Sequence, residues 1–122
     1  MVSRIGAVTT DCADPQRLAA FWAAVLGYET EEASDGWLLL RDPGGGGPDL
    51  GFQRVPEGKT VKNRVHLDLI PVDGAWHDEV KRLEDLGAAL VRYVDEQPEE
   101  AHWLMHDPEG NEFCCVWLRP AP

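Results

Sequence analysis

The sequence lacks a long apolar run. Its apolar runs, such as residues 37–40 and 113–118, are far shorter than the roughly 20 residues that a membrane-spanning helix needs. The N-terminal residues also lack the apolar stretch of a secretory signal, since they soon reach Asp11 and Asp14. We therefore expect a cytoplasmic protein with no membrane partner.

Basic residues are scarce in this sequence. Eleven Lys and Arg stand against twenty-two Asp and Glu, which gives a net charge of −11. Such a chain repels phosphate backbones and anionic lipid. Nucleic acid is therefore excluded as an expected partner.

Cysteine is also rare, and its arrangement argues against disulfides. The three cysteines are Cys12, Cys114 and Cys115, an odd number that includes two neighbours. Neighbouring cysteines pair only in a strained ring. No Cys-x-x-Cys motif is present, so the usual spacing of a structural zinc site is absent and we expect reduced thiols.

What the sequence does contain is enough apolar material for one folded domain of 122 residues, with 43% hydrophobic and 27% charged residues. A helix is predicted from Pro15, with Asp14 as its N-cap, to a stop at Gly27. A second helix is predicted over residues 73–87. The predicted strands are residues 4–11, 28–32, 37–41 and 49–55 in the first half, and 64–70, 88–94, 102–106 and 111–118 in the second.

The two halves repeat one another in spacing as well as in pattern. Ala7 lies seven residues before Asp14, and His66 lies seven residues before Asp73. This is typical of a duplicated module of about sixty residues. We therefore predict an α+β fold in which residues 1–122 form a single domain of two β-α-β-β-β modules, one over about 1–57 and the other over about 64–122.

Five short motifs in order carry a family resemblance. They are Asp14-Pro15, Phe21-Trp22, Leu26-Gly27, His66 at the start of the fifth strand, and residues 107–111 (Asp-Pro-Glu-Gly-Asn) before the last strand. With these the chain resembles the vicinal oxygen chelate superfamily, which includes glyoxalases, bleomycin-resistance proteins and extradiol dioxygenases, and most of all its small glyoxalase-like members. The resemblance implies curved mixed sheets around a shared cavity for a small-molecule ligand, with the helices outside. Because relatives commonly pair and strand edges need covering, we also expect a homodimer.

The resemblance also implies four metal-ligand positions, which fall on Ala7, Gln53, His66 and Cys114. Ala7 has no donor atom, Gln53 offers a neutral carbonyl, and Cys114 binds only as a thiolate. A catalytic metal site normally needs about three protein ligands. We therefore expect no metal and no other cofactor.

Strand alternation places His66 and Asp68 on one face of their strand, and Val65, Leu67 and Leu69 on the other. The apolar face is expected against the helix, which turns His66 and Asp68 towards the cavity as catalytic candidates. His66 beside Asp68 suits a general base held in one tautomer. The residues expected to bind substrate, mostly by the same alternation, are Thr9, Trp37, Gln53, Trp103, Met105 and Cys114.

Three functions remain open at the level of sequence. The first is a metal-independent lyase, isomerase or similar proton-transfer enzyme that uses His66 or Asp68. The second is a non-catalytic protein that sequesters a small molecule or drug, as bleomycin-resistance proteins do. The third is a scaffold that binds a protein partner. For His66 itself the alternative is an ordinary hydrogen-bonded strand residue, and for Cys114 it is a small buried residue.

Overall fold

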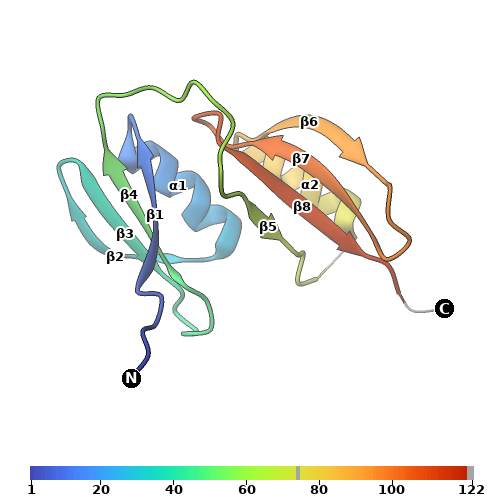
Figure 1. Cartoon of the computed structure of the whole chain (residues 1–122), viewed down its shortest axis with the longest axis horizontal. Coiled ribbons are helices and arrows are strands. Elements are labelled where there is room, and N and C mark those ends of the chain that lie inside the picture. Colours follow the sequence, from blue (N-terminus) through green and yellow to red (C-terminus); the bar gives the residue numbers. More distant parts are fainter. Residues whose placement is uncertain (74, 121–122) are drawn as a thin grey trace. The chain divides into compact units, whose positions relative to one another are not determined.

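The computed structural model describes residues 1–73 and 75–120 of the chain. Within them lie two helices and two four-stranded mixed sheets (Figure 1), so the predicted α+β fold of two β-α-β-β-β modules is confirmed. The elements are β1 (Ala7–Cys12), α1 (Pro15–Leu26), β2 (Glu29–Ser34), β3 (Trp37–Arg41), β4 (Asp49–Arg54), β5 (Leu67–Leu69), α2 (Trp76–Leu86), β6 (Ala89–Val94), β7 (Glu100–His106) and β8 (Glu112–Leu118). Contacts divide the chain into two compact units, with the boundary between Lys59 and Thr60.

The first unit is a sheet of order β1-β4-β3-β2 with α1 packed on one face (Figure 1). Strands β1 and β4 are parallel, and the other neighbours are antiparallel. Helix α1 begins where sequence reasoning predicts, because the Asp14 side chain accepts a hydrogen bond from Arg17 N at 3.1 Å and Pro15 occupies the first turn. It ends at Gly27, whose φ of 71° is a left-handed conformation that favours glycine.

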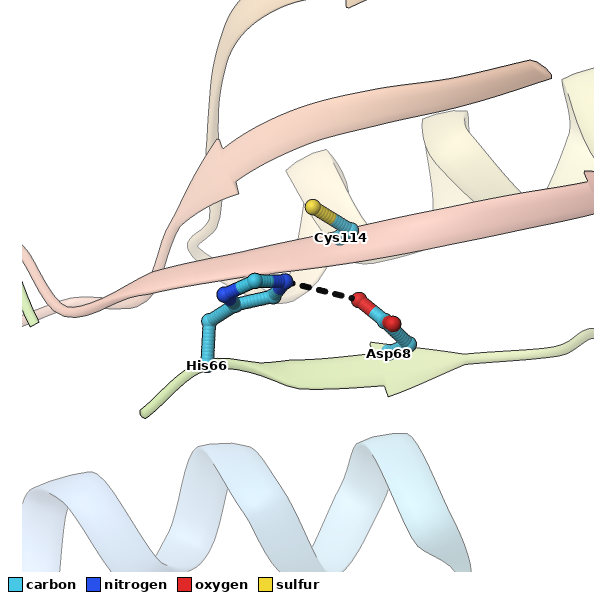
Figure 2. Close-up of side chains that lie close together, drawn as sticks. All are labelled: His66, Asp68 and Cys114. Atoms are coloured by element: carbon cyan, nitrogen blue, oxygen red, sulfur yellow. Dashed lines mark ion pairs between the residues drawn. The ribbon is translucent and has the colours of Figure 1, made fainter. Parts of the chain in front are cut away.

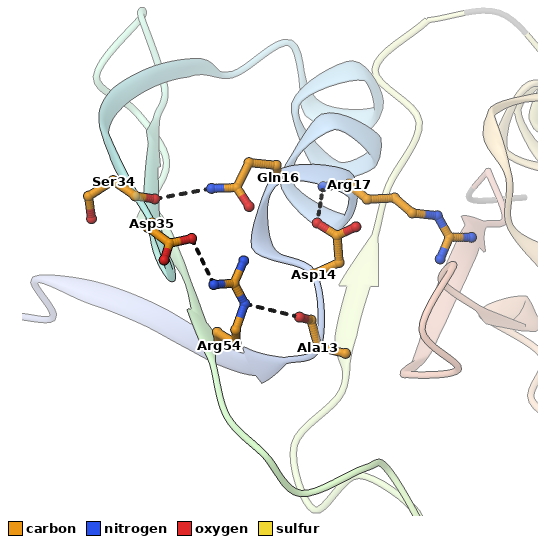
Figure 3. A network of polar contacts seen from close by, with 7 residues as sticks. All are labelled: Ala13, Asp14, Gln16, Arg17, Ser34, Asp35 and Arg54. Atoms are coloured by element: carbon orange, nitrogen blue, oxygen red, sulfur yellow. Dashed lines mark hydrogen bonds and ion pairs between the residues drawn. The ribbon is translucent and has the colours of Figure 1, made fainter.

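A polar network joins the start of α1 to two strands of its sheet (Figure 3). The Arg54 guanidinium lies 2.8 Å from Asp35 and donates to the carbonyl of Ala13 at 3.4 Å. Gln16 donates to the carbonyl of Ser34 at 3.1 Å. These contacts are exposed, so we regard them as fixing the position of the helix start rather than as a large source of stability.

The second unit repeats this arrangement with the order β5-β8-β7-β6 and with one parallel pair, β5 and β8. Helix α2 buries Val80 and Leu83. At its start, the ring of Trp76 lies 4.1 Å from that of Trp103 and 5.2 Å from that of Trp117, measured between ring centroids. Aromatic packing therefore fixes the start of α2, which has no side-chain N-cap.

Each unit also carries an aspartate that organises a loop before the last strand of its sheet. In the second unit Asp107 is 4% exposed and accepts hydrogen bonds from the backbone N–H groups of Glu109 and Asn111 and from the Asn111 side chain. In the first unit Asp42 accepts three bonds from backbone N–H groups in the glycine loop, residues 44–47. The sequence repeat is thus a structural repeat as well.

Three expectations about the second unit need correction. Strand β5 begins at Leu67 and has three residues, so His66 precedes the strand instead of opening it. Val65 is 72% exposed and does not belong to the apolar face packed against the helix. Helix α2 begins at Trp76, after the predicted start at Asp73, and Gly74 lies outside the described residues.

Each helix is short. Helix α1 has 12 residues and α2 has 11, and in the described part of the chain no helix has the length and apolar character that crossing a membrane requires.

Candidate functional site

The face of each sheet opposite its helix is called the open face here. On the open face of the second sheet, His66, Asp68 and Cys114 form a cluster (Figure 2). His66 Nε2 lies 3.2 Å from Asp68 Oδ1, and one ligand atom from each of the three residues lies within 4.8 Å of the others. The His66 and Asp68 side chains are 44% and 56% exposed, whereas Cys114 is 6% exposed. The structure therefore brings together the two predicted catalytic residues and one predicted binding residue.

Strand pairing explains this cluster. Asp68 of β5 lies directly opposite Cys114 of β8 in the parallel register. His66 is two residues before Asp68, so its side chain returns to the same face. Figure 2 shows the imidazole and the carboxylate pointing towards each other beneath β8.

The surroundings of Cys114 disfavour its thiolate. Burial, the negative charge of Asp68 and a hydrogen bond to Asp68 together raise the pKa of Cys114 to about 11. Lys62 opposes this rise as a smaller contribution. At neutral pH the Cys114 side chain is therefore a neutral thiol next to a carboxylate, and a poor nucleophile.

On the open face of the first sheet, Thr9, Trp37 and Gln53 lie near one another. Gln53 pairs with Trp37 of β3 on one side, and Thr9 pairs with Gly51 of β4. The Trp37 ring extends over Gly51 towards Thr9, since a Cβ built on Gly51 would lie 2.5 Å from the ring and 2.7 Å from the Thr9 hydroxyl. Trp37 Nε1 donates to Glu32 at 3.1 Å, which holds the ring in place. Thr9, Trp37 and Gln53, three of the residues expected to bind substrate, thus share this face with Gly51.

The placement predicted for Trp103 and Met105 is wrong. In the antiparallel register of β7 and β8, Trp103 pairs with Cys115 and Met105 pairs with Phe113, while Leu104 pairs with Cys114. Trp103 accordingly packs on Trp76 of α2, on the helix side of the sheet. Met105 shares that side and is fully buried. Both residues belong to the core and do not lie with His66.

Sequence reasoning missed two features of these faces. The contact of Trp37 with Gly51 was not predicted, although a glycine inside a strand is a recognised sign that another group approaches the backbone closely. The pairing of Asp68 with Cys114 was also missed, because it depends on the register between strands that are far apart in sequence.

The residues at the four family metal positions do not form a complete set of metal ligands. Ala7 has no donor atom, and Gln53 lies on the first sheet, where its register partners are Asp11 and Trp37. Of the four positions, only His66 and Cys114 have donor atoms near each other in one unit, and the third donor beside them is Asp68, which is not one of the four. One of the four family positions, Ala7, therefore has no ligand atom, and the family set is incomplete in this chain.

Each of the two modules thus has one helix, one parallel strand pair and one open sheet face. A protein-family model described as a glyoxalase-like domain matches residues 7–116. The chain therefore belongs to the glyoxalase-like domain family. A comparison with curated proteins finds no match.

Solved structures share this fold. A glyoxalase/bleomycin resistance protein/dioxygenase family enzyme from Burkholderia phytofirmans aligns with a TM-score of 0.78 at 21% identity, covering 96% of this chain and 100% of that chain. The fosfomycin resistance protein FosX from Listeria monocytogenes, as a mutant complexed with Mn(II) and a dihydroxypropylphosphonic acid, aligns with a TM-score of 0.74 at 14% identity, covering 94% and 90%. FosX from Mesorhizobium loti aligns with a TM-score of 0.71 at 13% identity, covering 95% of this chain and 92% of that chain. At these identities the likeness establishes the fold.

The contact between Trp37 and Gly51 is testable through stability. We expect Gly51→Ala to lower the free energy of unfolding by about 1–3 kcal/mol, because the added methyl group overlaps the Trp37 ring and the Thr9 hydroxyl. Urea unfolding followed by circular dichroism measures this change. Gly58→Ala is the matched control, since a Cβ there meets nothing within 4 Å. A Gly51→Ala protein as stable as the control variant would contradict the described contact.

Proposed function

We propose that this chain binds a small organic molecule on the open face of its second sheet and transforms it by proton transfer, without the family metal. The observation that carries the proposal is the 3.2 Å contact between His66 Nε2 and Asp68 Oδ1 on the face of the second sheet opposite α2. Both side chains are about half exposed, so a ligand can reach them. A neutral imidazole held by a carboxylate is a suitable general base near pH 7.

The contact between His66 and Asp68 also determines which imidazole nitrogen can act as the base. A carboxylate only accepts hydrogen bonds, so Asp68 selects the tautomer in which His66 Nε2 carries the proton. The lone pair is then on Nδ1, which faces away from Asp68 and takes the proton from the ligand. As the imidazole becomes positively charged, the adjacent Asp68 carboxylate stabilises it, in the way a base is supported by its orienting group. Cys114, neutral at this pH, contributes a weak hydrogen-bond donor to Asp68 and no nucleophile.

A second function, sequestration without reaction, is supported by the first unit. Trp37 presents an indole ring on the open face, with Gly51 beneath it and Glu32 holding its nitrogen. A planar ligand can stack on such a ring. The structural relative from Burkholderia phytofirmans is assigned to a family that includes bleomycin-resistance proteins. This function differs from the first in that the ligand is recovered unchanged.

The enzyme and binder proposals are separated by one series of measurements. We expect a metabolite library, screened by thermal shift, to contain compounds that raise the melting temperature, because a ligand that binds the native state stabilises it. With such a compound, His66→Gln is expected to lower turnover by about 100-fold or more, since the general base is lost. His77→Gln, a change on the exposed face of α2, is the matched control and is expected to keep full turnover.

Product analysis completes this series. Full turnover in His66→Gln would reject the proton-transfer mechanism. Saturable binding with unchanged ligand in the wild-type protein would favour sequestration.

Independence from the family metal gives a further prediction. Because Ala7 and Gln53 do not complete the four-position site, protein purified without added metal is expected to hold well under one equivalent of transition metal. Its melting temperature is expected to be unchanged by a chelator. Elemental analysis and a thermal melt with and without the chelator measure both quantities. One full equivalent of metal, retained through purification, would restore the metal-dependent chemistry of the superfamily.

The expected homodimer is also part of the proposal. Strand β6 lies at the edge of the second sheet and exposes Leu90, Val91 and Tyr93 by 43–46%. The corresponding edge strand of the first sheet, β2, has Glu29, Glu31 and Glu32 instead, which resist pairing with another edge. Light scattering at micromolar concentration is expected to give a mass of twice 13.5 kDa. A particle of 13.5 kDa under these conditions would rule the dimer out.

A further inference from the structure

The cluster of His66, Asp68 and Cys114 combines three chemically different donors. One ligand atom from each, an imidazole nitrogen, a thiol sulfur and a carboxylate oxygen, lies within 4.8 Å of the other two. Ligand atoms around a tetrahedral zinc ion, at about 2.0–2.3 Å from the metal, lie roughly 3.3–3.8 Å from one another. His66 and Asp68, whose side chains are exposed, are the two residues that would have to rotate to bring the three donors to that spacing.

The kind of donors selects the kind of ion. Magnesium and calcium bind oxygen ligands and do not favour sulfur or imidazole. Zinc binds nitrogen, sulfur and carboxylate oxygen, and three protein ligands leave its fourth position open. The net charge of −11 on the chain favours the approach of cations in general. We propose that His66, Asp68 and Cys114 form a reversible site for zinc, or a similar thiophilic divalent ion, on the open face of the second sheet.

This site differs from the four family positions in composition and in origin. Asp68 is not one of those positions, and the three ligands all belong to the second unit, where they come from β8 and from the segment around β5. Three ligands, two of them about half exposed, hold an ion less tightly than a closed set of four. The ion is therefore lost during purification without added metal and binds again when it is supplied.

An ion in this position would engage the atoms that the proposed function uses. His66 Nε2 and the Asp68 carboxylate would both turn to the metal, so the hydrogen bond that fixes the His66 tautomer would be lost. Zinc is thus expected to oppose the proton-transfer role. This consequence rests on the proposed function, whereas the binding of the ion does not.

Cobalt(II) provides a direct spectroscopic test on the full chain. Titration of chelator-treated protein is expected to give saturation at one equivalent, with a sulfur-to-cobalt charge-transfer band that zinc displaces. Cys114→Ser is expected to remove the band. Cys115→Ser is the matched control, because Cys115 is the adjacent residue, pairs with Trp103 and lies on the helix side of the sheet. The band should persist in that variant.

Two surface variants keep the test decisive if a cysteine variant fails to fold. His66→Gln and Asp68→Asn change exposed side chains and are each expected to weaken cobalt binding at least tenfold. His77→Gln and Asp78→Asn, exposed on α2, are the matched controls and are expected to bind like the wild type. Absence of the charge-transfer band in wild-type protein, or cobalt affinity unchanged in both His66→Gln and Asp68→Asn, would overturn the site.

The effect on His66 is measured separately. Diethyl pyrocarbonate acylates accessible imidazoles, and peptide mass spectrometry locates the modified residue. One equivalent of zinc is expected to protect His66 at least tenfold, while His77 reacts equally with and without zinc. If cobalt binds but zinc leaves His66 equally reactive, His66 is not a ligand and the three-residue site is wrong.

Discussion

The structure depends on one constraint, which is that within each unit a single helix packs on one face of a four-stranded sheet. A sheet buries apolar side chains on the face that the helix packs against, and the alternation of side chains sends every second residue to the other face. In the first unit that open face is occupied by Trp37 lying over Gly51. In the second it carries His66 and Asp68. The candidate residues therefore lie, in each unit, on the face of the sheet opposite that unit's own helix.

Duplication supplied two similar scaffolds that carry different chemistry. Ala7 and His66 occupy corresponding positions, each seven residues before an aspartate, yet only one of them has a donor atom. Gln53 and Cys114 correspond in the same way, as a neutral amide and a thiol. The cluster of His66, Asp68 and Cys114 therefore lies entirely in the second unit. By contrast, the loop-organising aspartates Asp42 and Asp107 are present in both, since a loop before the last strand needs its backbone N–H groups satisfied in either module.

The sequence was sufficient to predict the elements because their signals are local. Asp14 with Pro15 begins α1, and Gly27 ends it. The prediction that Trp103 lies with the site residues was wrong because alternation within a strand shows which residues share a face. It does not show which of the two faces of the sheet that is. The answer depends on pairing with β8, where Cys114 meets Leu104 and a shift of one residue would reverse the result. The prediction that Val65 packs against the helix was wrong for a related reason, since β5 begins only at Leu67.

The environment of Cys114 lay beyond prediction from sequence, and it sets the charge of the candidate site. Nothing near residue 114 in the chain indicates a carboxylate, yet Asp68 lies directly across from it on β5. Burial and that carboxylate both oppose ionisation of the thiol, so the negative charge of the cluster resides on Asp68 alone. A second negative charge brought to this face would meet Asp68 and a chain of net charge −11, with Lys62 as the cation that acts on Cys114. The charges around Cys114 therefore disfavour an additional anion near Asp68 on this face of the second sheet.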